Sequence, residues 1–127
     1  MTQPLQAAGL AKLVSALIAD GTVKFLQWGT GSGAAQSANA VTAGSTTEAR
    51  VAGTLSAVMT TLAGDTYQVV GTLIAAGARA ITELGVFDAA GSGSPPTGGN
   101  MDIYGSFAVI NLGAGDSIAF TVKVAFS

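Results

Sequence analysis

The acidic residues are the main candidates for chemistry in this chain, because it contains no histidine and no cysteine. Without histidine it lacks the commonest general base and cannot build a Ser-His-Asp triad, and without cysteine it has no thiolate nucleophile or thiolate metal ligand. Two facing carboxylates could hydrolyse a glycoside, and a D-x-D-x-D-G run could bind calcium, but the sequence shows neither pattern. The seven acids are Asp20, Glu48, Asp65, Glu83, Asp88, Asp102 and Asp116.

Most of these acids lie in turn contexts such as Asp20-Gly21, Gly64-Asp65 and Gly115-Asp116. An aspartate in a turn accepts hydrogen bonds from its own backbone, which explains its presence without a ligand. We therefore expect no catalytic residue, no metal ligand and no cofactor, and we predict that the protein is not an enzyme.

Glu83 is the exception, because it lies in the middle of a predicted strand, in the stretch AITELGVF. Alternation places it on the same face as Ile81 and Phe87, where an unpaired carboxylate would cost several kcal/mol if buried. Arg79 is four residues away, about 13 Å along a strand, so Arg50 is the better partner. We predict a structural Glu83–Arg50 ion pair, with solvent exposure as the alternative and catalysis as the least favoured interpretation.

Two further patterns invite a binding function. The glycine-rich stretch WGTGSGAAQS lacks the lysine of a phosphate-binding loop and is not expected to open a helix, so a loop without nucleotide is favoured. Trp28, Tyr67 and Tyr104 could stack on a sugar or a base, but they are far apart in the sequence. Packing in a core or an interface is the favoured role for these aromatic residues.

Composition restricts the class of partner. The chain has 127 residues, with 49% hydrophobic and only 9% charged residues, whereas an ordinary soluble domain has roughly 25% charged residues. Its five cations are scattered singly and its net charge is −2, which offers no electrostatic footprint for nucleic acid or an anionic membrane. So little charge favours a surface covered by copies of the chain or by a partner. The apolar start of the chain lacks a positive region before it, so we do not expect a signal peptide.

A helix is predicted over about residues 6–19, with Pro4 in its first turn and Gly21 as its C-cap. Its apolar residues follow helical spacing and form one stripe. Two interpretations of this stripe stay open: it packs on the sheet of its own domain, or it docks on a neighbouring subunit. The stripe consists of Leu10, Leu13, Val14, Leu17 and Ile18.

The remainder of the chain predicts β-structure. A strand over 22–28 is followed by a long polar loop over 29–49, and turn signals then recur every ten to fifteen residues. The last strand alternates strictly, from Ile118 to Phe126. We predict one domain of the mainly β class: a helix or arm over 1–21, then an antiparallel β-sandwich or jelly-roll-like domain over 22–127.

Several stretches, taken in order, resemble a family. They are LIADGTVKFLQWGTG, ARVAGTL, TYQVVGTLIAAGARAITELGVFDAA and MDIYGSFAVINLGAGDSIAFTVKVAF. They are similar to a group of small structural proteins of tailed bacteriophages, in which a helix leads to a W-G-T-G strand, an R-V-x-G-T segment, an A-I-T-E-x-G-L-F strand and a closing hairpin. The resemblance covers most of the chain, and it is the order of the motifs, more than any single one, that carries it.

The resemblance implies a capsid decoration, or cement, protein that binds the outer phage head and stabilises contacts between capsomers. Its implied partners are the major capsid protein and copies of itself, as a dimer or trimer, with no nucleic acid, membrane or small-molecule substrate. It would be made in the host cytoplasm and reside on the virion surface. A tail-fibre, collar or baseplate component is the alternative, and a sugar-binding module is a third possibility. Partner contacts are expected from the loops 29–48 and 92–100 and from Leu10, Leu13, Leu17, Ile18 and Trp28.

Overall fold

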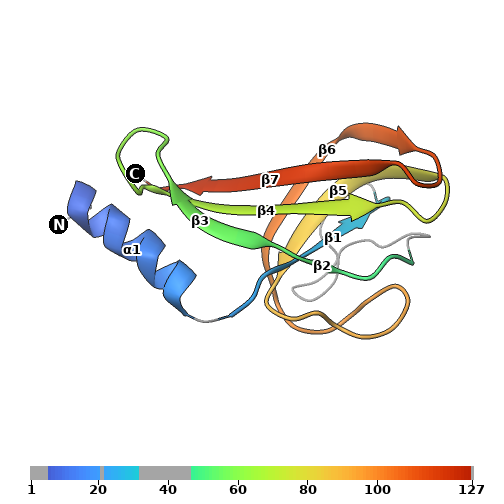
Figure 1. The fold of residues 1–127 in the computed structure, drawn as a ribbon, viewed down its shortest axis with the longest axis horizontal. Coiled ribbons are helices and arrows are strands. Elements are labelled where there is room, and N and C mark those ends of the chain that lie inside the picture. The colour runs from blue at the N-terminus through green and yellow to red at the C-terminus, as the bar shows by residue number, and fades with distance from the viewer. Residues whose placement is uncertain (1–5, 21, 32–46, 127) are drawn as a thin grey trace.

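The computed structural model describes residues 6–20, 22–31 and 47–126 of the chain. Two antiparallel sheets face each other, and one helix lies beside them (Figure 1). The four-stranded sheet has the order β2-β1-β5-β6 and the three-stranded sheet the order β3-β4-β7. This arrangement confirms the predicted mainly β sandwich with an N-terminal helix. The strands are β1 (Phe25–Gly29), β2 (Val51–Ala52), β3 (Thr54–Val58), β4 (Thr66–Ile74), β5 (Arg79–Phe87), β6 (Met101–Leu112) and β7 (Ser117–Ala125).

The helix α1 (Ala7–Ala19) lies against β3 and β4, on the part of the three-stranded sheet that the other sheet leaves uncovered (Figure 1). It buries Leu10 and Val14, which are one turn apart and therefore share a face. Leu10 is only 2% exposed, so its expected role as a partner contact is wrong, whereas Leu13 and Leu17 remain 36% and 38% exposed. The predictions for Pro4 and Gly21 lie outside the described residues. No helix within these residues has the length and apolar character to cross a membrane.

The core lies between the sheets and is formed mainly by the inward residues of β1, β4 and β5. Trp28 is 1% exposed and packs edge-on against Phe120, with ring centroids 6.4 Å apart. A side chain buried in this way cannot contact a partner or stack on a sugar, so the expected contact through Trp28 is wrong. The structure confirms core packing, the favoured interpretation of the aromatic residues, for Trp28.

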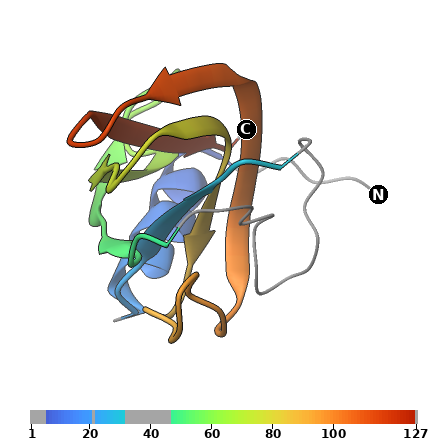
Figure 2. The same ribbon diagram turned by 90° about the vertical axis from the view of Figure 1, so that its right-hand side faces the viewer.

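An irregularity in the pairing of β5 with β6 accompanies a change in which residues of β5 face the core. The pairing between β5 and β6 shifts between Ile81, which faces Ile110, and Glu83, which faces Ser106. Ile81 and Leu84 both belong to the core between the sheets, so Glu83, which precedes Leu84, points to the opposite face although it is fully buried. The expected common face of Ile81 and Glu83 is therefore wrong; the strand changes phase where three residues of β6, 107–109, stand opposite the single residue Thr82 of β5. In Figure 2, the long strand β6 turns sharply along its length.

One side of the sandwich is closed by the chain itself. β2 belongs to one sheet and β3 to the other, and only Gly53 separates them. The Gly53 N–H donates to the Lys24 carbonyl at 2.7 Å. A Cβ at this position would lie 2.5 Å from Val69 Cγ1 and 2.8 Å from Leu26 Cδ1. The chain crosses between the sheets here because glycine leaves room for core side chains from both of them.

Turns at the two ends of the sandwich are held by backbone and carboxylate contacts. The Asp65 carboxylate accepts the backbone N–H groups of Thr60, Thr61 and Leu62, at 2.8 to 3.0 Å. These hydrogen bonds hold the pKa of Asp65 well below its usual value. At the other end, a hydrogen bond links the β4–β5 turn to the β6–β7 turn: the Ala75 N–H donates to the Asp116 carbonyl at 2.8 Å.

We expect Gly53→Ala to lower the free energy of unfolding by about 1–3 kcal/mol, because the added methyl group overpacks the core beside Val69 and Leu26. Gly105→Ala is the matched control, since a Cβ there has no atom within 4 Å, and its effect should stay within about 0.5 kcal/mol. Urea unfolding of both variants checks this. Equal losses in the two variants would show that the crossing is not a packing constraint.

Candidate functional site

Glu83 has a partner other than the one that the sequence predicts. Its side chain is fully buried, and its Oε2 accepts a hydrogen bond from the Tyr104 hydroxyl at 2.6 Å. Burial, together with this hydrogen bond and the charge of Glu83, raises the pKa of Tyr104 to about 12. The other oxygen, Oε1, has no hydrogen-bond partner within the described residues. Tyr104 lies on β6, so the contact ties two adjacent strands.

Arg50 is occupied elsewhere, and the predicted Glu83–Arg50 ion pair is therefore wrong. Its Nε donates to Gln27 Oε1 at 2.8 Å, and its Nη1 donates to the Ala89 and Gly98 carbonyls at 2.8 and 2.9 Å. The guanidinium also lies 3.7 Å from the centre of the Phe87 ring, at the far end of β5 from Glu83. Arg50 thus fastens the loop before β6 to the outer face of the four-stranded sheet.

The ion pair that the structure does contain at the β4–β5 turn was not found by sequence reasoning. Glu48 Oε1 accepts the Ala76 N–H at 2.9 Å and the Arg79 Nε at 3.1 Å. Burial raises the pKa of Glu48, but the hydrogen bonds from Ala76 and Trp28 and the charge of Arg79 outweigh it, so the net pKa is lowered. No local signal marks this pair, because Glu48 falls at the end of a long polar loop and 31 residues from Arg79.

The side of the sandwich opposite Gly53 is open. β6 and β7 are the edge strands of different sheets, joined only through their connecting turn and not by a strand ladder. The core-facing residues of β4 and β5 are buried, whereas those along these two edges are only partly covered. We call this surface the seam; it consists of Ile103, Phe107, Phe120, Val122, Val124 and Phe126.

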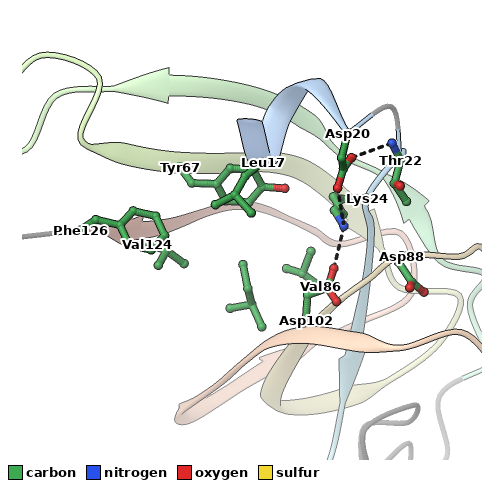
Figure 3. Close-up of a pocket in the computed structure, with 11 residues that line it drawn as sticks. Leu17, Asp20, Thr22, Lys24, Tyr67, Val86, Asp88, Asp102, Val124 and Phe126 are labelled. Atoms are coloured by element: carbon green, nitrogen blue, oxygen red, sulfur yellow. Dashed lines mark hydrogen bonds and ion pairs between the residues drawn. The ribbon is translucent and has the colours of Figure 1, made fainter. Parts of the chain in front are cut away.

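Two cavities lie along the seam. The smaller, about 320 Å³, lies between the Tyr104–Phe107 part of β6 and the Phe120–Lys123 part of β7. The larger, about 480 Å³, lies farther along, where the seam meets the end of α1 (Figure 3). Its volume is in the range of small-molecule and side-chain binding pockets.

The larger cavity carries both charge and an unpaired hydroxyl. Lys24 Nζ lies 2.7 Å from Asp102 Oδ2 and 4.0 Å from Asp20 Oδ2. Burial lowers the pKa of Lys24, but the hydrogen bond to Asp102 and the two carboxylate charges outweigh it and raise the net value. The Tyr67 hydroxyl is buried without a hydrogen-bond partner in the described residues, and it points toward Lys24 and Asp20 in Figure 3.

The charged groups of the larger cavity are paired with one another. Within the described residues, no three acids gather closely enough to hold a metal ion, and the carboxylates of the larger cavity face an ammonium group. The exposed Leu17 borders this cavity, while Ile18 packs partly against the core, so the helix reaches the seam at its C-terminal end. Comparisons with protein-family models, with curated proteins and with solved structures find no match for this chain.

Loss of the hydroxyl should change the stability of the protein differently at its two tyrosines. Tyr104→Phe removes the only partner of the buried Glu83 carboxylate among the described residues, so we expect the free energy of unfolding to fall by about 1–3 kcal/mol. Tyr67→Phe removes a hydroxyl that has no partner there, so stability should be unchanged or higher. Urea unfolding at neutral pH measures both, and a similar loss in the two variants would contradict the assignment.

Proposed function

We propose that this chain is a virion structural protein of a tailed bacteriophage, a decoration protein that binds the outer head and stabilises contacts between capsomers. The seam is the observation that carries the proposal. A lone protein rarely leaves a core edge uncovered along two unpaired strands, and such a surface marks an interaction site. The low charge of the chain and the resemblance of its ordered motifs support the same assignment.

The two edge strands of the seam lack the features that prevent edge strands from pairing with another chain. β6 has twelve residues but only one charged side chain, Asp102, and β7 has only Lys123. Neither strand contains proline. Exposed Val109 and Ile110 add apolar surface on β6, at 53% and 38% exposure. Long edges with little charge and no proline are the kind that pair with another chain.

A second copy of the chain is the occupant that we assign to the seam. Edge pairing would satisfy backbone N–H and C=O groups of both chains, and the partly exposed aromatic residues would be buried at the same time. The single charges on the two edges have opposite signs, so β6 of one copy can approach β7 of another without repulsion. The apolar gain is roughly 25 cal/mol per Å² before the cost of association, and many such contacts over a shell add through avidity.

We expect the protein to co-purify with phage particles in hundreds of copies per particle when the phage that encodes it is grown. Quantitative mass spectrometry of gradient-purified particles measures the copy number against the major shell protein. A handful of copies would move the assignment to the tail, collar or baseplate. Particles free of the protein would contradict a virion role altogether.

We also expect Val109→Lys to weaken self-association at least about tenfold, because a charge on the β6 edge must be desolvated when a second strand pairs there. Met59→Lys is the matched control, since Met59 is 68% exposed and follows β3, which lies at the opposite edge of the three-stranded sheet from β7. Sedimentation equilibrium of the two variants and the parent chain measures the difference. A monomeric parent chain at high concentration, or an equal loss in both variants, would contradict the role of the seam.

A further inference from the structure

The larger cavity of the seam has the chemistry of a binding site in its own right. We propose that it binds a protonated amine or guanidinium group carried on an apolar stem. This inference does not depend on the proposed virion role. It rests on three features of the cavity: its charge balance, the unpaired Tyr67 hydroxyl and its apolar wall.

The charge balance of the cavity favours a cation. Three carboxylates, those of Asp20, Asp88 and Asp102, line it together with one ammonium group, that of Lys24. Asp88 is engaged by the backbone and side chain of Asn100, whereas Asp20 and Asp102 have side chains that are 43% and 39% exposed. Their exposed surface can receive a second cation, while an anion approaching Lys24 would meet three negative charges.

Tyr67 supplies an independent sign of a missing partner. The residue is 5% exposed, and its hydroxyl oxygen is buried without a hydrogen bond to the described residues. A buried hydroxyl without a partner costs about as much as a lost hydrogen bond, and native proteins rarely leave one unexplained. In Figure 3 the hydroxyl points into the cavity, toward the side that carries Lys24 and Asp20. An N–H group of a bound cation would find an acceptor there.

The cavity also has an apolar lining. Leu17 from α1, Ile103 from β6 and Val124 and Phe126 from the β7 region line it, and they surround a volume of about 480 Å³. Such a wall suits a chain of several methylene groups whose charged end reaches the carboxylates, as lysine and arginine side chains do. A lysine or arginine of a protein segment and a free alkylamine share this chemistry.

Titration of the full chain with pentylamine, followed by ¹⁵N–¹H NMR, tests the proposal. We expect saturable shifts of the Lys24, Tyr67 and Asp102 amides, which weaken as salt is added. Pentanol and pentanoate have the same stem without the positive charge and should bind at least about tenfold more weakly. Nα-acetyl-lysine N-methylamide separates the two sources: tighter binding than pentylamine indicates a protein segment, and weaker binding indicates a free amine.

Variants locate the contacts. Tyr67→Phe should weaken pentylamine binding about threefold to tenfold without loss of stability, as expected for one hydrogen bond. Asp20→Asn removes one negative charge from the cavity and should weaken pentylamine binding by a similar factor. Asparagine keeps an acceptor for the Thr22 N–H, so the local turn is preserved. Asp116→Asn, in the distant β6–β7 turn, removes the same charge outside the cavity and should leave binding unchanged. Three results would each overturn the proposal and leave a water-filled cavity. They are chemical shifts that do not saturate, pentanol binding as tight as pentylamine binding, and parent-like binding by both cavity variants.

Discussion

The covered and the uncovered side of this molecule both depend on where the chain passes between its two sheets. On one side, β2 runs into β3 through Gly53, and the core residues beneath this crossing, Leu26 and Val69, are fully buried. On the other side, β6 and β7 meet only at their turn, and no strand within the described residues bridges them. One domain therefore has a closed side and an open side, and most of the partly covered aromatic and aliphatic residues lie on the open one.

The few charged groups of the chain are used mainly to hold segments in place. Arg50 fastens the loop before β6, Glu48 and Arg79 secure the β4–β5 turn, and Asp65 caps the turn before β4. Each of these carboxylate and guanidinium groups is held by hydrogen bonds to backbone groups. In some cases an opposite charge contributes as well. This arrangement offsets the cost of burying charge in a small domain, because hydrogen bonds replace the lost water.

Three buried polar atoms are exceptions to this pattern: Arg50 Nη2, Tyr67 Oη and Glu83 Oε1 have no partner within the described residues. Arg50 and Glu83 each have another polar atom that is firmly bonded, so their side chains are anchored. Tyr67 has no such anchor, and it is the member of the three that lines a cavity. The exposed apolar seam and this unpaired hydroxyl therefore lie on the same open side of the molecule.

The sequence by itself determined the class of fold and the approximate positions of the helix and of the first and last strands. The helix stripe, the strict alternation of the last strand and the glycine-containing turns are local patterns, and local patterns fix periodicity. Tertiary structure alone decided which faces are covered. The register shift between β5 and β6 near Glu83 accompanied a change of face that simple alternation did not predict, and Arg50 took carbonyl partners from a loop 39 and 48 residues away. Edge position likewise left the inward residues of β7 half-covered, because burial depends on neighbouring strands that no single stretch of sequence specifies.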